Sequence, residues 1–198
     1  MDGNNDVWFF WYGDYSNEVY ALSTIIAIRE TQKSEVNLLP SVEHSAAQLF
    51  RFIPELTWIA DGHVQTEQQH LEYISQGNSW VALNENAQPI GFILAKLLDG
   101  GLHIMELSVH QHWQRKGIGK ALIEKVIQVA RCRHLEAVTL TTFRYVDWNA
   151  PLYQKLGFDI LAPQQITEAL HQILQSEIDY GFSEEQRCAM RHLLTYPC

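Results

Sequence analysis

The sequence predicts a mixed α+β fold with one central sheet. Three observations predict it: apolar runs separated by short polar turns in residues 79–109, alternating helical and strand patterns after residue 113, and a composition that is 46% hydrophobic and 19% charged. A chain of 198 residues suits one domain, and this apolar fraction is enough to bury a core.

The first 23 residues are crowded with aromatic side chains that follow no clear period. These aromatics are Trp8, Phe9, Phe10, Trp11, Tyr12, Tyr15 and Tyr20. We interpret residues 1–23 as an N-terminal extension, either an arm that packs on a partner or on the body, or a segment upstream of the working domain. Residues 24–198 are interpreted as a single domain. The run 24–29 is rich in β-branched residues and predicts the first strand.

Two helices are predicted before residue 78. The first begins at Pro40 and ends at Pro54, because apolar residues recur on one face at helical spacing. That face is formed by Val42, Ala46, Leu49, Phe50 and Ile53. The second begins at Thr66, where Thr66 and Gln69 fit a capping box, and ends at Gly77.

Residues 79–109 are predicted to form an antiparallel meander. Its strand candidates are residues 79–83, 90–98 and 102–109. Polar residues 84–86 form the first turn, and Asp99-Gly100-Gly101 marks the second.

Helices and strands alternate after the meander. Apolar periodicity predicts a helix from Gly117 to about Arg133, followed by a strand over residues 137–142. This order requires a crossover, so the strands on either side of the helix are predicted to be parallel.

The last part of the chain predicts three more elements. Asn149 as N-cap, Pro151 in the first turn and Gly157 as stop predict a short helix. A helix over residues 165–177 and a final strand over residues 188–194 complete the pattern.

Net charge, hydropathy and cysteine content disfavour several classes of protein. A formal charge of −9 is unfavourable for general binding to nucleic acid or to an anionic membrane. No run of 18 apolar residues is present, and residues 1–6 lack the basic region of a secretory signal. Cys132, Cys188 and Cys198 are odd in number and widely spaced, so neither a disulfide framework nor a cysteine-rich zinc site is predicted. We therefore expect a cytoplasmic protein with no membrane or nucleic-acid partner.

Positive charge gathers in one segment of this acidic chain. Residues 113–144 hold seven basic and two acidic side chains, a net +5, which leaves −14 for the remainder. A local basic patch favours a small anionic ligand over a polyanion, while a solvated helix face is the alternative. The charge of the remainder favours a cationic acceptor such as a small amine, a polyamine or a basic peptide.

A basic turn with two glycines lies at the start of the helix in that segment. It reads Gln114-Arg115-Lys116-Gly117-Ile118-Gly119-Lys120. Helix N-termini carry unpaired N–H groups and the positive end of the helix dipole, so the turn predicts a site for phosphate oxygens. Gly117 and Gly119 lack a Cβ where a ligand would contact backbone, and Arg115, Lys116 and Lys120 add positive charge.

Two other phosphate motifs do not fit this turn. A P-loop requires glycine where the chain has Gln114 and a hydroxyl where it has Ala121. A dinucleotide fingerprint requires glycine where the chain has Leu122, and it follows a parallel strand rather than a meander.

The remaining pattern, Q-x-x-G-x-G after a strand, resembles the pyrophosphate-binding signature of the GNAT superfamily, the acyl-CoA-dependent N-acyltransferases. A second motif of that superfamily follows, with Leu140-Thr141-Thr142-Phe143 and then residues 149–158. The resemblance covers roughly residues 25–157, and residues 187–191 resemble the final strand of a bacterial branch whose substrates are mostly unassigned. It implies a three-layer α/β arrangement with about six to seven strands and helices on both faces of the sheet.

The resemblance also implies an activity, the direct transfer of an acetyl group from acetyl-CoA to a primary amine of a small molecule or peptide. The implied residues that bind coenzyme A are Leu107, Ser108, Val109, Gln114, Arg115, Lys116, Gly117, Ile118, Gly119, Lys120, Asn149 and Tyr153. A backbone N–H of Ser108 or Val109 would polarise the thioester carbonyl. Tyr153 matches the general acid of the family, and a tyrosine is protonated at pH 7.

Glu106 is the leading candidate for the base, directly or through water. Strand alternation places it on one face with Ile104 and Ser108. A carboxylate in an otherwise apolar strand is costly unless it is paired or functional. A glutamate bonded to a neighbouring backbone group or arginine is the alternative.

Several candidates lie outside the cofactor segment. Asp61 or Asp147 would attract a substrate ammonium, and Trp58 or Trp148 would stack on it, while a structural role is the alternative for each. His110 and His112 flank the turn without an evident third ligand, so no metal is expected.

Two other classes of function stay open. One is a non-catalytic sensor or regulatory module that binds acyl-CoA, and the other is an interaction adaptor that uses residues 1–23. The complete turn and Tyr153 favour the enzyme. Dimers are common in the resembling family, so a homodimer is a further expectation.

Overall fold

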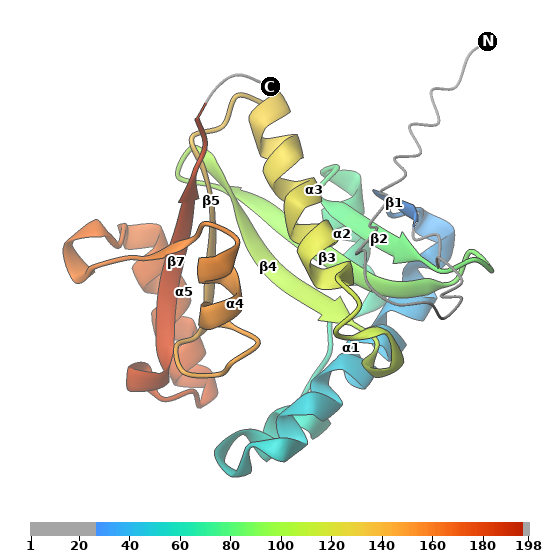
Figure 1. Ribbon diagram of the computed structural model, residues 1–198, viewed down its shortest axis with the longest axis horizontal. Coiled ribbons are helices and arrows are strands. Elements are labelled where there is room, and N and C mark those ends of the chain that lie inside the picture. The colour runs from blue at the N-terminus through green and yellow to red at the C-terminus, as the bar shows by residue number, and fades with distance from the viewer. Residues whose placement is uncertain (1–26, 196–198) are drawn as a thin grey trace, which may run out of the picture. The chain divides into compact units, whose positions relative to one another are not determined.

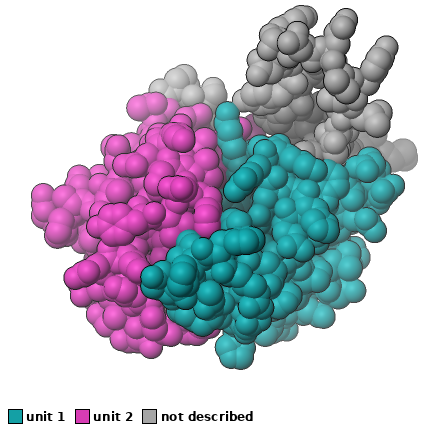
Figure 2. Space-filling view, turned by 60° about the horizontal axis from the view of Figure 1, so that its bottom comes forward, with its two compact units in different colours: residues 1–94, 107–122 teal, residues 95–106, 123–198 magenta. Residues whose placement is uncertain are grey.

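The computed structural model describes residues 27–195. The predicted extension, residues 1–23, lies outside the described residues, as does the start of the first predicted strand. The chain divides into two compact units that are interleaved along the sequence (Figure 2). The described parts of unit 1 are residues 27–94 and 107–122, and those of unit 2 are residues 95–106 and 123–195.

The described residues form a seven-stranded mixed sheet with the strand order β1-β2-β3-β4-β5-β7-β6 (Figure 1). The strands are β1 (Ala27–Glu30), β2 (Ser79–Leu83), β3 (Pro89–Leu98), β4 (Gly101–Val109), β5 (Ala137–Phe143), β6 (Asp159–Ile160) and β7 (Arg187–Leu193). The predicted sheet and its strand number are confirmed, and the three meander strands lie within a residue or so of their expected bounds. The short strand β6 was not predicted.

Five α-helices accompany the sheet in the described residues. They are α1 (Leu39–Ala47), α2 (Glu67–Ser75), α3 (Ile118–Cys132), α4 (Ala150–Lys155) and α5 (Glu168–Tyr180). The 3₁₀ helices are η1 (Lys33–Leu38), η2 (Gln48–Phe52), η3 (Pro54–Asp61), η4 (Gln111–Trp113), η5 (Pro163–Gln165) and η6 (Glu184–Gln186). Within residues 27–195, none of the helices combines the length and apolarity that a membrane-spanning segment needs.

The predicted helix from residue 40 to residue 54 is wrong in its second half. The α-helix ends at Ala47, and the chain continues as the tighter η2. The side-chain amide of Gln48 donates to the carbonyl oxygens of His44 at 3.1 Å and Ala60 at 3.0 Å. The bond to Ala60, at the end of η3, is a long-range contact that local periodicity cannot predict.

In unit 1, β1 and β2 pair antiparallel, and β2 pairs antiparallel with the first part of β3. The predicted capping box at the start of α2 is confirmed. Thr66 Oγ1 accepts from the backbone N–H of Gln69 at 3.3 Å, and Gln69 Oε1 accepts from the N–H of Thr66 at 2.8 Å. The helix places the buried ring of His70 edge-on against Phe92, with ring centroids 5.0 Å apart.

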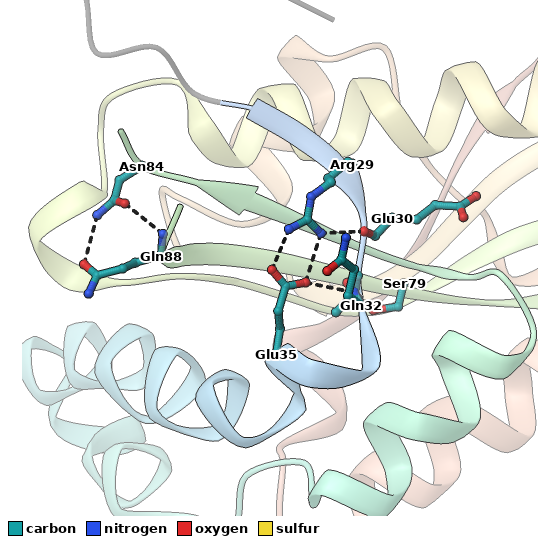
Figure 3. A network of polar contacts seen from close by, with 8 residues as sticks. Arg29, Glu30, Gln32, Glu35, Ser79, Asn84 and Gln88 are labelled. Carbon is teal, nitrogen blue, oxygen red and sulfur yellow. Dashed lines mark hydrogen bonds and ion pairs between the residues drawn. The ribbon is translucent and has the colours of Figure 1, made fainter. Parts of the chain in front are cut away.

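A polar network connects β1 of unit 1 to the helical segment that follows it (Figure 3). The Arg29 guanidinium binds both carboxylate oxygens of Glu35, at 2.6 and 3.0 Å. The backbone N–H of Gln32 also donates to Glu35, at 2.8 Å. Elsewhere in unit 1, Asn84 Oδ1 accepts from the backbone N–H of Gln88 at 2.9 Å and thereby closes the predicted turn between β2 and β3.

In unit 2, the predicted parallel crossover is confirmed. β4 and β5 run parallel from Leu102↔Val138 to Ile104↔Leu140. On its other side, β5 pairs antiparallel with β7 along its whole length. A Cβ on Gly101 would lie 2.4 Å from the carbonyl oxygen of Ala137, so this close approach of β4 to β5 requires glycine.

Helices α4 and α5 cover opposite faces of β5 within unit 2. Thr141 Oγ1 donates to Glu177 of α5 at 2.5 Å, whereas Thr142 Oγ1 accepts from Asn149, at the start of α4, at 2.8 Å. Neighbouring residues on a strand point to opposite faces, so these two bonds assign the helices to different sides.

Candidate functional site

The predicted phosphate turn belongs to unit 1, between the end of β4 and the start of α3. The side-chain amide of Gln114 donates to the carbonyl oxygen of Val109 at 3.0 Å, which ties the turn to the end of the strand. Ile118 is buried and anchors the first residue of α3. The first turn of an α-helix leaves its amides without intrahelical acceptors, so this helix start suits an anionic ligand.

The two glycines of the turn have different structural reasons. Gly117 has a φ of +83°, and a Cβ there would meet nothing within 4 Å. Its backbone conformation, rather than crowding, therefore favours glycine. Gly119 lies in α3, where a Cβ would meet Leu107 and Val109 only at an ordinary 3.9 Å. Packing does not require glycine at residue 119, and its absent side chain leaves the helix start open to a ligand.

Basic side chains of the turn lie at the surface of unit 1. Arg115 and Lys116 are exposed, while Lys120 is half-buried. The Lys116 ammonium lies 4.6 Å from the centre of the Trp113 ring, close enough for a cation–π contact. The turn therefore combines helix amides with positive charge, as phosphate binding requires.

The parallel ladder of β4 and β5 ends before β4 does. Its register stops at Ile104↔Leu140, whereas β4 continues to Val109. The half-buried Glu106 of unit 2 follows the ladder, and Ser108 and Val109 of unit 1 come after it in the strand. The last five residues of β4, which include Glu106, Ser108 and Val109, therefore lie beyond the parallel ladder.

Tyr153 of α4 lies buried in unit 2. Its ring packs against Phe158 with centroids 5.7 Å apart. Burial raises the pKa of the Tyr153 hydroxyl, the charge of Glu106 raises it further, and Arg187 acts in the opposite direction. The hydroxyl therefore keeps its proton around neutral pH, which suits a proton donor. The two predicted catalytic residues, Tyr153 and Glu106, are thus electrostatically coupled within one unit.

Asn149 occupies the predicted N-cap position of α4, but the predicted side-chain cap is not formed. The backbone of Asn149 has φ −111° and ψ −115°. Its side chain donates from Nδ2 to Thr142 Oγ1 instead of accepting from the helix amides. Its Oδ1 is buried and has no hydrogen-bond partner. Buried acceptors without a partner are rare in folded proteins, so this oxygen is a candidate to accept a hydrogen bond from a ligand.

A buried ion pair in unit 2 was missed in the sequence. The guanidinium of Arg187 donates to Glu177 at 2.6 and 2.8 Å, and the Arg187 side chain is 8% exposed. Its guanidinium carbon lies 4.6 Å from the Phe143 ring centre and 5.0 Å from that of Phe182. Glu177 lies on α5 and Arg187 on β7, so no local spacing predicts their contact.

The predicted substrate residues are divided between the units. Trp58 and Asp61 share η3 in unit 1, whereas the exposed Asp147 belongs to unit 2. Asp61 forms an ion pair with Arg51 at 2.5 Å, and this cation competes with the proposed substrate ammonium. The Trp58 indole donates to the carbonyl oxygen of Glu55 at 3.2 Å.

The histidines beside the turn contact each other. His110 Nδ1 accepts from the backbone N–H of His112 at 3.3 Å, and their ring centroids lie 5.2 Å apart. Among the described residues, no three His, Cys, Asp or Glu side chains are grouped so as to hold a metal ion.

Comparisons with known proteins agree with this geometry. Residues 45–158, more than half of the chain, match the sequence profile of the Acetyltransferase (GNAT) family. The chain is 32% identical over 94 residues to N-acetyltransferase family 8 member 3 of Mus musculus, an alignment that covers 43% of this chain and 41% of that protein. The chain thus spans about two fifths of the length of this relative.

Solved structures share the fold. The PaiA N-acetyltransferase of Thermoplasma acidophilum, in complex with coenzyme A, has a TM-score of 0.61 at 17% identity, covering 85% of this chain and 99% of that chain. N-acetylglutamate synthase from Neisseria gonorrhoeae, complexed with coenzyme A and N-acetyl-glutamate, has a TM-score of 0.64 at 13% identity. The match covers 91% of this chain and 37% of that chain.

Proposed function

The chain belongs to the acetyltransferase (GNAT) family, and from this premise we propose that it transfers an acetyl group from acetyl-CoA to a primary amine of a small molecule or peptide. The observation that carries the proposal is the burial of Tyr153 in unit 2, where burial and the charge of Glu106 raise the pKa of its hydroxyl. A proton donor and a proton acceptor are the two groups that amine acetylation needs.

Two features of the chain fit coenzyme A. The turn around Gly117 and Gly119 suits the pyrophosphate, because it presents a helix start with basic side chains. The unpartnered Oδ1 of Asn149 suits an amide N–H of the pantetheine arm. The proposed binding residues remain Leu107, Ser108, Val109, Gln114, Arg115, Lys116, Gly117, Ile118, Gly119, Lys120, Asn149 and Tyr153. When bound, acetyl-CoA supplies an acetyl group activated as a thioester.

In the proposed reaction, residues of this chain transfer protons and stabilise the developing charge. In this proposal Glu106 takes the proton that the attacking amine must lose, directly or through water. A backbone N–H of Ser108 or Val109 stabilises the negative charge that develops on the acetyl oxygen. Tyr153 gives its proton to the departing sulfur.

The acceptor is proposed to be a cationic amine, such as a small amine, a polyamine or a basic peptide. The support is the net charge of −14 that remains outside residues 113–144. Asp147 and Trp58 remain proposed contacts, and Asp61 would act only after release from Arg51. We also propose that the protein is cytoplasmic and forms a homodimer. Cell fractionation would test the location, and light scattering would test the dimer.

Thiol release from acetyl-CoA tests the activity. We expect release above the hydrolysis background with at least one of a panel of amines, polyamines, amino acids and basic peptides. Mass spectrometry of the product should show a single added acetyl group. Calorimetry with coenzyme A is the matched measurement of cofactor binding. Binding without thiol release for every amine would contradict the enzyme and favour the sensor.

A further inference from the structure

Trp113 has no part in the proposed function so far, although it lies beside the proposed phosphate turn in unit 1. It is the last residue of η4, and its side chain is half-buried. The ammonium of the exposed Lys116 lies 4.6 Å from the centre of its ring. Tryptophan attracts a cation more strongly than the other aromatic side chains do, so the ring is a favourable place for this ammonium.

The backbone that carries Trp113 is bonded to other parts of unit 1. The N–H of Gln111, at the start of η4, donates to the buried Ser45 Oγ of α1 at 3.1 Å. The N–H of Trp113 itself donates to the carbonyl oxygen of His110 at 2.8 Å. These two bonds fix the segment from which the ring projects.

The backbone on either side of Lys116 is left-handed. Arg115 has a φ of +61° and Gly117 a φ of +83°. This conformation is uncommon for arginine, whereas glycine adopts it readily. The chain therefore makes a tight turn here, and Lys116 contacts the ring of Trp113 three positions before it.

A lysine that is held in advance binds an anion at a smaller cost in entropy. An exposed lysine samples many rotamers, and it loses this freedom when it binds a ligand. The Trp113 ring already restricts Lys116 before any ligand arrives. The ammonium has three N–H donors, and the ring lies on only one side of it, so it can still donate to an anion.

Resting on the proposed function, we propose that Trp113 is a positioning residue that holds the Lys116 ammonium for a phosphate of coenzyme A. Coenzyme A has two kinds of phosphate, the pyrophosphate and the 3′-phosphate of its ribose. Both present oxygens that accept charged hydrogen bonds from an ammonium. In this proposal Trp113 acts through Lys116 and does not contact the phosphate.

Two variants with matched controls test the proposal. Trp113→Leu removes the ring, and Lys116→Met removes the charge. Phe52→Leu is the control for the ring, and Lys33→Met is the control for the charge. Both control residues are exposed and lie elsewhere in unit 1.

Calorimetry with coenzyme A measures the effect on affinity. Loss of a charged hydrogen bond should weaken the binding of Lys116→Met about ten-fold. Loss of the cation–π contact should weaken the binding of Trp113→Leu about three-fold, and Trp113→Phe, which keeps an aromatic face, should recover part of that loss. Both controls should match wild type. Wild-type affinity in Trp113→Leu would overturn the proposal.

The Lys116→Met background separates positioning from a direct contact. Without the ammonium there is nothing for the ring to hold, so adding Trp113→Leu should cause no further loss of affinity. The same three-fold loss in both backgrounds would show that the ring acts independently of Lys116, which contradicts the proposed role.

Dephospho-coenzyme A, which lacks the 3′-phosphate, identifies the phosphate. If Lys116 binds the 3′-phosphate, wild type and Lys116→Met should bind this analogue equally. If it binds the pyrophosphate, the ten-fold difference should persist. Either result supports the proposal when Trp113→Leu follows the same pattern as Lys116→Met, and opposite patterns in the two variants would overturn it.

A measurement without any ligand tests the contact itself. In protein labelled with fluorotryptophan, the ¹⁹F resonance of Trp113 is identified by its loss in Trp113→Leu. It should move in Lys116→Met and stay in place in Lys33→Met. Because Lys116 is exposed, this variant is expected to fold. An unmoved resonance in Lys116→Met would rule out the holding contact.

Failure of the proposed function gives a different pattern. No binding of coenzyme A by the wild type would end the proposed cofactor site, and the role of Trp113 with it. Binding without thiol release would end the proposed activity, while the affinities of the variants still decide the role of Trp113. Normal binding and activity together with wild-type affinity in Trp113→Leu would overturn the role of Trp113 alone.

Discussion

Asn149 donates its side-chain amide to the hydroxyl of Thr142 at 2.8 Å, although it stands at the N-terminus of α4, where an asparagine commonly caps the helix amides. The other side-chain atom, Oδ1, is buried and has no hydrogen-bond partner. Because the Asn149 side chain is bonded to Thr142, its Oδ1 does not accept from the helix amides. We propose that this oxygen accepts a hydrogen bond from coenzyme A.

Asn149→Ala should weaken the binding of coenzyme A about ten-fold, because a lost hydrogen bond of roughly 1.4 kcal/mol changes a dissociation constant by that factor. Thr142→Val is the matched control, since it removes the same internal bond but keeps Oδ1. Calorimetry with coenzyme A measures both. The two variants should lose a similar free energy of unfolding, and equal affinities would contradict the role of Oδ1.

Gly119→Glu should abolish coenzyme A binding, because it places bulk and negative charge at the start of α3. Gly119→Ala should fold normally, since the added Cβ meets Leu107 and Val109 only at 3.9 Å. The alanine variant therefore separates loss of binding from loss of fold. Thermal unfolding of both variants and calorimetry make the comparison. Wild-type affinity in Gly119→Glu would refute the pyrophosphate assignment.

Tyr153→Phe should lower kcat by about 10²-fold or more while leaving acetyl-CoA affinity nearly unchanged, which is the size expected for loss of a general acid. The raised pKa of Tyr153 fixes the sign of the pH dependence. A tyrosine ordinarily loses its proton near pH 10, so this residue stays in its active, protonated form up to at least about that pH. A falling limb of kcat below pH 9 that disappears in Tyr153→Phe would contradict this.

His70 should make the fold less stable in acid. Burial lowers its pKa to about 4, and neither ring nitrogen has a hydrogen-bond partner. Between its unfolded value near 6.5 and about pH 4, the unfolded chain binds a proton that the folded chain does not, so stability falls as pH falls.

Chemical denaturation at pH 7 and pH 5 measures this effect. Between pH 7 and pH 5, the free energy of unfolding of His70→Leu should fall by about 2 kcal/mol less than that of wild type, because the proton uptake of one histidine is removed. The buried His103 of unit 2, whose pKa burial also lowers to about 4, should still contribute in the variant. Identical losses in wild type and variant would rule out His70 as the source.

Local sequence signals predicted the elements well. The capping box at Thr66, the positive φ of Gly77 and the strands of the meander are all set by residues close together in the chain. The crossover rule also predicts the parallel pairing of β4 with β5, which the structure confirms.

Side-chain partners separated in sequence were not predictable. After Ala47 the chain continues as the 3₁₀ helix η2, where the Gln48 side chain binds the carbonyl oxygen of Ala60, and Asp61 is paired with Arg51. Each contact joins residues more than one helical turn apart, and many partners of the same type exist in the chain. Periodicity therefore carries no information about which pair forms.

The sequence by itself determined the order of helices and strands, the glycine-containing turn and the motif that places Tyr153 on α4, because these follow from local backbone preferences and spacing. Only the tertiary structure decided that Asn149 binds Thr142 instead of capping its helix, and that Glu177 pairs with a buried Arg187. The physical reason is that hydrogen bonds and charges act through space, across residues that only the folded sheet brings together.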